Sequence, residues 1–287
     1  MPKVAYDLIH PEKRTTSVVF ASPHSGRDYP WSFLRRTQLD RQTIRSSEDA
    51  YVDQLFDSAP DHGAPFLRAG APRAFVDLNR GPDELDPALI EGVARQGHNP
   101  RISSGLGVIP RVVAGGREIY SGKLPLSEAK RRIAQYWRPY HAMLERQVNE
   151  AHALFGEAIL VDCHSMPHEA MDIVAKGVKK RPEVVIGDRF GAAASSEVVE
   201  KIEASFAAAG LTVVRNAPFA GAYVVQTYGR PSKGRHAVQV EVDRSLYMNE
   251  ALVRPNGNFN SFRRLMRQVT AEIAEIGCQG EARLAAE

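Results

Sequence analysis

Short apolar runs alternate with longer amphipathic stretches along this chain. The apolar runs are rich in β-branched residues and predict strands at residues 17–21, 74–78, 158–162, 183–186, 212–215 and 237–242. The amphipathic stretches predict helices at residues 50–58, 127–155, 194–209 and 260–276. Pro139 removes a backbone donor from the longest of these helices and should kink or split it. Strands that alternate with helices predict an α/β three-layer sandwich with a mixed, largely parallel central sheet.

The composition narrows the classes of function. The 287 residues, 43% of them hydrophobic, can bury one full core, so we expect a single domain over residues 1–287. Thirty-seven basic residues are scattered among 34 acidic ones, which argues against nucleic acid as a partner. The chain has no apolar stretch of about 18 residues and no export-type N-terminus, so we expect a cytoplasmic protein without a membrane partner. The two cysteines lack paired spacing, and the pattern leaves the oligomeric state open.

Two of the predicted strands each lead into a histidine, His24 and His164. Open α/β sheets bind ligands just past the carboxyl ends of their strands. A catalytic zinc uses three ligands drawn from histidine and carboxylate and keeps a fourth position for water. The third ligand is expected in the pair Glu48 and Asp49. We favour Asp49 because its spacing to Asp53 would place both carboxylates on one helical face, with Asp53 in support, but Glu48 stays open.

Another predicted strand is followed by Asn79 and Arg80, an amide and a guanidinium in sequence. An arginine forms paired, charge-assisted hydrogen bonds with a carboxylate, and an adjacent amide adds a neutral donor. The pair is therefore a candidate for binding an acidic substrate group. In the alternative interpretation, Arg80 only pairs with Asp77 or Asp83.

Glu241 lies within the last predicted strand, where it alternates with valines. If this polar face points into a zinc site, Glu241 can take a proton from water and return it to a leaving amine. If the strand is an ordinary edge, the same face is only solvated. The residues alone favour neither of these two interpretations over the other.

Several motifs resemble those of the N-formylglutamate amidohydrolases, a branch of the zinc-dependent exopeptidase-like hydrolases related to aspartoacylases and carboxypeptidases. The motifs follow the family's order over most of the chain. They are PHSG at 23–26, EDAYVDQLF at 48–56, PRAFVDLNR at 72–80, IYSGKLPLSEAKRRIAQYWRPYH at 119–141, DCHSM at 162–166, HAVQVEV at 236–242 and YMNE at 247–250.

The resemblance implies a zinc-exopeptidase-like fold and a role for each matching residue. It implies that one Zn²⁺ is held by His24, Asp49 and His164, that Glu241 is the general base and acid, and that Arg73, Asn79 and Arg80 bind the substrate's carboxylate end. More distant relatives have a glutamate three residues after the first histidine, where this chain has Arg27. Because arginine cannot ligate a cation, that departure strengthens the choice of Asp49.

A second departure concerns the substrate. Family members often have a basic Gly-Arg-Phe-Lys-Gly-Gly stretch before a tyrosine, whereas residues 217–222 read APFAGA here. The loss of two cations should weaken selection for a second acidic group. The expected function is hydrolysis of N-formyl-L-glutamate or a similar small N-acyl amino acid. The alternatives are a carboxypeptidase-like hydrolase of another acyl amino acid or peptide, and a non-catalytic ligand-binding protein.

Overall fold

The computed structural model describes residues 2, 4–94, 99–176 and 180–278, and in these residues seven strands form one sheet. Its order is β1-β3-β2-β6-β9-β7-β8. β3, β2, β6 and β9 run parallel to one another, β1 and β7 run antiparallel to their neighbours β3 and β9, and β8 is parallel to β7. The predicted mixed, largely parallel sheet is thus confirmed. The strands are β1 (Tyr6–Ile9), β2 (Val18–Ser22), β3 (Phe66–Ala69), β6 (Ala158–Met166), β7 (Val184–Gly187), β8 (Val213–Arg215) and β9 (Arg235–Asp243).

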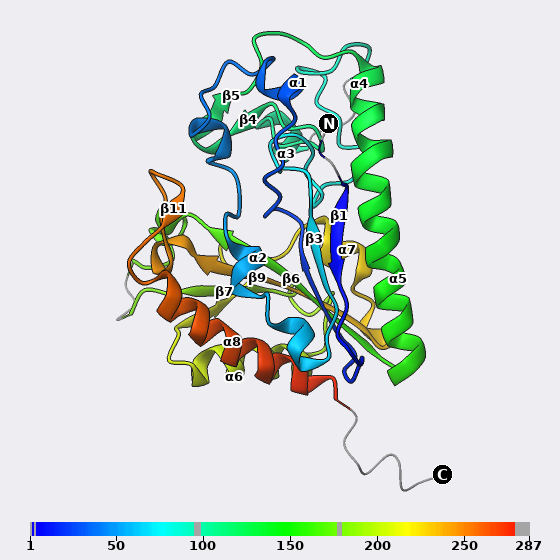
Figure 1. Cartoon of the computed structure of the whole chain (residues 1–287), viewed down its shortest axis with the longest axis vertical. Coiled ribbons are helices and arrows are strands. Elements are labelled where there is room, and N and C mark those ends of the chain that lie inside the picture. Colours follow the sequence, from blue (N-terminus) through cyan, green and yellow to red (C-terminus); the bar gives the residue numbers. More distant parts are fainter. Residues whose placement is uncertain (1, 3, 95–98, 177–179, 279–287) are drawn as a thin grey trace, which may run out of the picture.

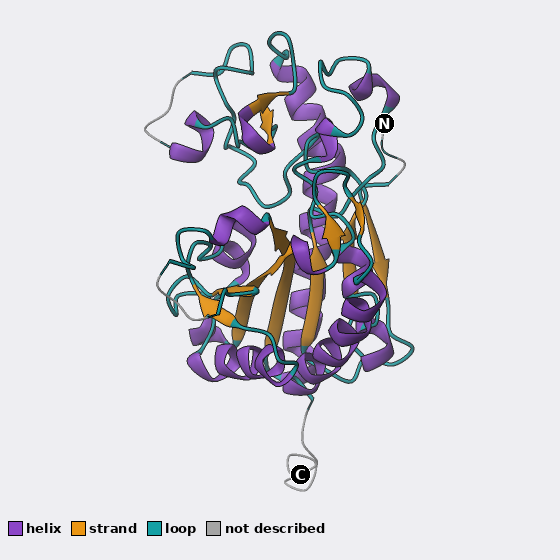
Figure 2. Ribbon diagram, turned by 90° about the vertical axis from the view of Figure 1, so that its left-hand side faces the viewer, coloured by secondary structure: helices purple, strands orange, loops and turns teal. Residues whose placement is uncertain are grey.

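Helices cover both faces of this sheet, which confirms the three-layer sandwich (Figures 1 and 2). One face packs against α5 (Arg138–Phe155) and α7 (Tyr223–Tyr228), and the other against α2 (Val52–Leu55), α6 (Ser196–Ala208) and α8 (Phe259–Ile276). The side chains of β2 alternate between these layers: Val19 and Ala21 belong to the core beside α5, and Val18 and Phe20 to the core beside α8. The period-two alternation of the strand therefore supplies both cores.

The long helical stretch does not break at Pro139. α4 (Leu126–Arg132) continues through a π-helical turn at Ile133–Trp137 into α5, and Figure 1 shows one continuous helix along the sheet. Pro139 lies at the start of α5, where its missing N–H falls directly after the widened turn. The backbone thus accommodates the proline by a π-bulge, one of the known causes of local helix distortion.

Smaller elements lie outside the seven-stranded sheet, and those at residues 31–34 and 100–118 lie near the top of Figure 1. An isolated bridge between Thr37 and Tyr120 joins the segment after α1 to the segment before α4. The short helices and strands are α1 (Trp31–Leu34), α3 (Pro100–Ser103), β4 (Val112–Val113), β5 (Arg117–Glu118), β10 (Met248–Asn249) and β11 (Arg254–Pro255). Short 3₁₀ turns lie at Thr43–Arg45, Ala59–His62, Ala114–Gly116, His168–Met171, Pro231–Lys233 and Arg244–Leu246. Within the described ranges, no helix has the length and apolar character needed to cross a membrane.

The prediction of a strand at residues 74–78 is wrong, because this segment forms turns and an irregular loop. Its apolar side chains are nevertheless buried: the guanidinium carbon of Arg132 lies 4.0 Å from the centre of the Phe75 ring, and Arg132 also donates to the Phe75 carbonyl. The strand beside β2 is β3 instead, which the pattern missed. An apolar run indicates that its side chains are buried, but it does not show that they belong to a strand. Here the loop is buried beneath a helix without pairing in the sheet.

The helix predicted at residues 50–58 is also shorter than expected. Tyr51 adopts the left-handed conformation, with φ of 67°, and α2 begins only at Val52. A non-glycine residue rarely adopts this conformation. It separates Asp49 from the helix, so the carboxylate is displayed on a loop.

Candidate metal centre and active site

The two histidines come together because one lies just past a strand and the other lies within the parallel strand beside it. β2 and β6 are paired so that Ala21 lies opposite Asp162, which places His24, just past β2, beside His164, within β6. The centres of their rings are 4.8 Å apart. The turn that carries His24 passes close to another loop: a Cβ atom on Gly26 would lie 2.1 Å from the carbonyl oxygen of Ala71. Glycine is therefore required two residues after this histidine.

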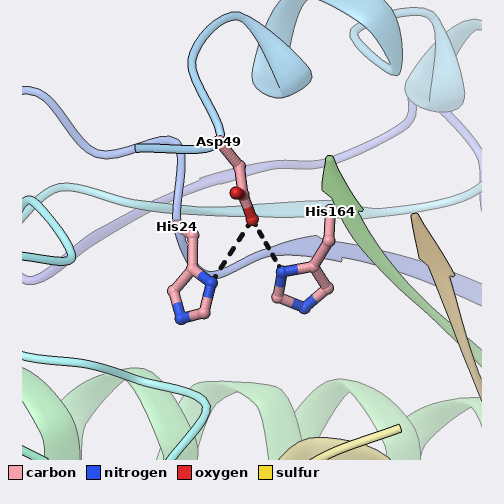
Figure 3. A group of neighbouring side chains, drawn as sticks. All are labelled: His24, Asp49 and His164. Atoms are coloured by element: carbon pink, nitrogen blue, oxygen red, sulfur yellow. Dashed lines mark hydrogen bonds and ion pairs between the residues drawn. The ribbon is translucent and has the colours of Figure 1, made fainter. Parts of the chain in front are cut away.

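Asp49 completes a buried group of three ligand-type side chains (Figure 3). Its Oδ2 atom lies 2.8 Å from Nδ1 of His164 and 3.3 Å from Nδ1 of His24. One donor atom from each residue lies within 4.8 Å of the others. The backbone N–H of Asp49 also donates to the carbonyl of His24, at 3.1 Å, which fixes the loop against the turn. The structure thus brings together the three residues proposed as metal ligands.

The Nε2 atom of each histidine ring lies beside the carboxylate of an aspartate. Nε2 of His24 lies 2.7 Å from Oδ1 of Asp77, and Nε2 of His164 lies 2.9 Å from Oδ2 of Asp162. A carboxylate at Nε2 keeps the proton there and leaves the Nδ1 lone pair free for a cation. In the described part of the chain, the buried Nδ1 of His24 has no hydrogen-bond partner. These residues therefore fit a metal ion.

Charge in this cluster is strongly interdependent. Burial alone would raise the pKa of Asp49, but the imidazoles of His164 and His24 hold it well below its usual range. Burial alone would lower the pKa of His164, but Asp162 and Asp49 hold it well above its usual range. Arg244 adds a further cation, with Nη2 at 2.9 Å from Oδ1 of Asp49. The centre is thus organised around an ionised Asp49.

The neighbouring acids point elsewhere. Glu48 accepts hydrogen bonds from Arg45 Nε, at 3.0 Å, and from the Tyr29 hydroxyl, at 2.6 Å, so its carboxylate is already occupied. The expectation that Asp53 supports Asp49 is wrong, because Asp53 instead pairs with Arg27 at 2.7 Å. The short α2 begins after Asp49, so the two acids do not share a helical face. Arg27 occupies the position where the more distant relatives have a glutamate, and in this protein Asp53 is its ion-pair partner.

Glu241 lies opposite His164 in the register of β6 and β9. Its side chain is buried, with 9% of the residue exposed, so the interpretation as a solvated strand face does not hold. Gln239, two residues earlier on the same strand face, donates from Nε2 to Oε1 of Glu241 at 2.8 Å. Burial raises the pKa of Glu241 to about 7, against the opposing charge of His164. A carboxylate with a pKa near neutrality suits proton transfer.

The two arginines proposed to bind substrate have different partners. Nε of Arg73 donates to Oδ2 of Asp77 at 3.1 Å. Arg80 donates to backbone carbonyls, from Nε to Leu106 at 3.0 Å and from Nη1 to Asn79 at 2.8 Å. The alternative in which Arg80 pairs with Asp77 or Asp83 is not seen among the described ion pairs. Both guanidinium groups line the same cavity as the histidines.

The amide of Asn79 is engaged within the protein. Its Oδ1 accepts from the backbone N–H of Val224 at 2.8 Å, and its Nδ2 lies 3.4 Å from both Asp162 Oδ2 and Gln239 Oε1 and 3.2 Å from Nε2 of His164. These contacts join the loop after β3 to β6 and β9. Asn79 is therefore placed to hold other site residues in position.

One cavity of about 570 Å³ is lined by both histidines, by Glu241 and by the guanidinium groups of Arg73 and Arg80. Sequence reasoning missed Asp77, Asp162, Gln239, Arg101 and Arg244, all of which line it or support it. A signal existed for Asp162, which precedes His164 by two residues and so shares its strand face. The others are separated from the histidines by long stretches of chain, and no local pattern joins them.

The fold and the site define an α/β protein in which two histidines and an aspartate could hold a metal ion, beside a cavity that Glu241 also lines, and metal-dependent hydrolases use an arrangement of this kind. Comparison with known proteins identifies the family. The chain belongs to the N-formylglutamate amidohydrolases, whose family model matches residues 16–248. The resemblance seen in the sequence motifs is thereby confirmed.

Relatives and solved structures agree with this membership. The chain is 33% identical to the N-formylglutamate deformylase of Pseudomonas putida over 236 residues, which is 81% of this chain and 82% of that protein. It is 31% identical to the N-formylglutamate deformylase of Pseudomonas aeruginosa, over 70% of this chain and 71% of that one. The crystal structure of an N-formylglutamate amidohydrolase from Ralstonia eutropha JMP134 superposes with a TM-score of 0.88 at 34% identity, covering 95% of this chain and 98% of that one.

Proposed function

We propose that this protein hydrolyses N-formyl-L-glutamate to formate and L-glutamate, with one Zn²⁺ held by His24, Asp49 and His164. The observation that carries the proposal is the convergence of these three ligand-type side chains, two of which, His24 and His164, line the same cavity as Glu241. The choice of substrate is supported by the two Pseudomonas relatives, which are N-formylglutamate deformylases. Two imidazole nitrogens and one carboxylate form a donor set that zinc prefers, and they leave a fourth position open.

A zinc ion in this site supplies Lewis acidity for the acyl oxygen and lowers the pKa of water to about 7. Glu241 takes one proton from the water that attacks the formyl carbon. It returns that proton to the amide nitrogen as the carbon–nitrogen bond breaks, so that the free amine and formic acid are released, and the acid ionises to formate by giving its proton to the amine or to solvent. Arg73 stabilises the negative charge that develops on the formyl oxygen. Arg80 binds the α-carboxylate of the substrate through its guanidinium.

The test of this mechanism is Glu241→Gln, with formate release and bound zinc measured on the same sample. The substitution keeps the size of the side chain and removes its capacity to accept a proton. We expect kcat to fall at least about a hundredfold while zinc content is unchanged. Glu272→Gln, on the exposed side of α8, is the matched control and should behave as the unmodified protein. Full turnover by the Glu241 variant would exclude this residue as the base.

A second pair of variants tests the third ligand. Asp49→Asn removes the charge that faces both imidazoles, and we expect zinc affinity to fall more than about tenfold, because even the loss of an outer partner of a ligand costs that much. Glu48→Gln changes the adjacent acid, which pairs with Arg45, and should leave zinc affinity within about twofold. Zinc affinity is measured by competition with a chromogenic chelator. The opposite order would assign the ligand to Glu48.

A further inference from the structure

Arginine side chains concentrate in the cavity that holds the candidate metal centre. They are Arg73, Arg80, Arg101 and Arg244. The first and the last are each ion-paired with an acid of the site, Asp77 and Asp49 respectively. The other two form no ion pair with a carboxylate in the described part of the chain. These two guanidinium groups therefore line the cavity without an ion-pair partner among the described residues.

A single turn connects these two unpaired arginines. Nε of Arg80 donates to the carbonyl of Leu106, and the N–H of Leu106 donates to the carbonyl of Arg101 at 2.8 Å. Arg101 lies in α3, whose first turn is capped by Asn99: the side chain of Asn99 accepts from the N–H of Arg101 at 3.0 Å. Glu84 in turn receives a hydrogen bond from Asn99, at 3.4 Å. The positions of the two arginines are thus fixed relative to each other by backbone hydrogen bonds.

The two arginines differ in depth. Arg80 is 7% exposed, and it follows Asn79, whose amide contacts His164. Arg101 is exposed and belongs to the outer part of the same cavity. Burial lowers the pKa of the Arg80 guanidinium, and the like charge of Arg101 acts in the same direction against the charge of Asp77. Anionic ligand groups placed between or beside these cations would relieve that repulsion.

We propose that Arg101 is a specificity-determining residue, which binds the side-chain carboxylate of an N-formyl dicarboxylic amino acid while Arg80 binds its α-carboxylate. This inference rests on the proposed function. In such a substrate the α-carboxylate is attached to the carbon that bears the formamide nitrogen, so it lies near the centre and reaches the deeper Arg80. The side-chain carboxylate extends two carbons farther and reaches the outer Arg101.

The assignment changes the expectation drawn from residues 217–222. That apolar stretch contributes Pro218 and Phe219 to the cavity and no cation. Selection for a second acidic group was therefore expected to be weak. Arg101 supplies the cation from α3 instead, a different segment of the same cavity wall, so selection for the dicarboxylate is retained.

The test compares N-formyl-L-glutamate with N-formyl-L-glutamine, which differ only in the charge of the side chain. For Arg101→Gln we expect kcat/KM for N-formyl-L-glutamate to fall at least about tenfold, mainly through KM, because one charge-assisted pair is lost. The value for N-formyl-L-glutamine should stay within about twofold. Arg101→Lys keeps the charge without the paired geometry and should give an intermediate loss. Arg264→Gln, on α8, is the matched control and should change neither value.

The outcomes separate this inference from the proposed function. An equal loss for both substrates in Arg101→Gln, or no loss for either, would overturn the role of Arg101 alone. An unmodified protein that releases formate from neither substrate would overturn the proposed function, and the role of Arg101 with it.

Discussion

Asp77 and Asp162 hold equivalent nitrogens of the two site histidines, but they differ in their other contacts. Oδ1 of Asp77 faces Nε2 of His24 and also accepts from the N–H of Asn79 at 2.8 Å, while its Oδ2 accepts from Arg73 at 3.1 Å. Both oxygens of Asp77 therefore face donors. By contrast, in the part of the chain that is described, only Oδ2 of Asp162 has partners, and its buried Oδ1 has none. This difference predicts unequal effects of the same substitution.

An asparagine at position 162 can keep its oxygen toward His164 and place its amide nitrogen where the partnerless Oδ1 was. An asparagine at position 77 has no such solution, because in either orientation its NH₂ group faces a donor, from Arg73 on one side or from His24 and Asn79 on the other. Both variants lose a charge, and an outer partner of a metal ligand is worth about ten- to a hundredfold in affinity. We expect about tenfold for Asp162→Asn and about a hundredfold for Asp77→Asn. The difference, about 1.4 kcal/mol, is the cost of placing one donor against another at position 77, whereas position 162 only keeps one polar atom without a partner.

The assay is zinc affinity at fixed pH, measured by chelator competition, with thermal unfolding of the metal-free variants measured alongside. The difference in affinity requires that the conflict be larger when the His24 ring is held by the ion, so the metal-free variants should differ less in unfolding free energy than in zinc-binding free energy. Affinities equal within about twofold, or a greater loss for Asp162→Asn, would refute the reasoning from partner geometry.

Three further predictions follow from buried polar contacts. Gln239→Met removes the donor to Glu241 and should lower kcat about tenfold with a smaller change in KM, measured by formate release. Burial lowers the pKa of His141 from 6.5 to about 4, so on acidification the unfolded chain binds the proton before the folded protein does. The free energy of unfolding should therefore fall by up to about 3 kcal/mol as the pH drops from 6.5 to 4. In urea unfolding, His141→Gln should reduce this dependence on pH. Arg132→Met leaves a buried hydrogen-bond and ion-pair network incomplete and should destabilise the protein by about 3 kcal/mol, with kcat of the folded protein unchanged.

The central layers of the fold were predictable because their signal is local. β2, β7, β8 and β9 each lie within about two residues of a predicted apolar run, and α6 and α8 within one or two residues of a predicted amphipathic stretch. A β-branched run bounded by polar or turn residues has few other ways to bury itself. The failure at residues 74–78 has the same origin, since an apolar loop that packs against Arg132 of α4 produces the same apolar run as a strand.

The chemistry of the site was predictable only in part. The histidines could be found because two apolar runs end just before them, although β6 itself continues past the predicted end at 162 and includes His164. The partners that fix their tautomers and charge come from distant segments: Arg244 is 195 positions from Asp49, and Asp77 is 53 from His24. The local argument for Asp53 failed because it assumed a helix that Tyr51 does not permit. Pairings of this kind depend on tertiary packing, which leaves no periodic trace in the sequence.

Glu241 shows how packing and chemistry depend on the same register. The pairing of β6 with β9 is unbroken from Ala158 opposite Arg235 to Met166 opposite Asp243. On one face it aligns Cys163 and Val240 within the core beside α8, and on the other it aligns His164 with Glu241. A slip of one residue would turn the carboxylate into that apolar core and a valine into the site. Burial of the valines of β9 therefore fixes the position of the proposed base, so selection for a stable core at this pair of strands is also selection for the geometry of the site.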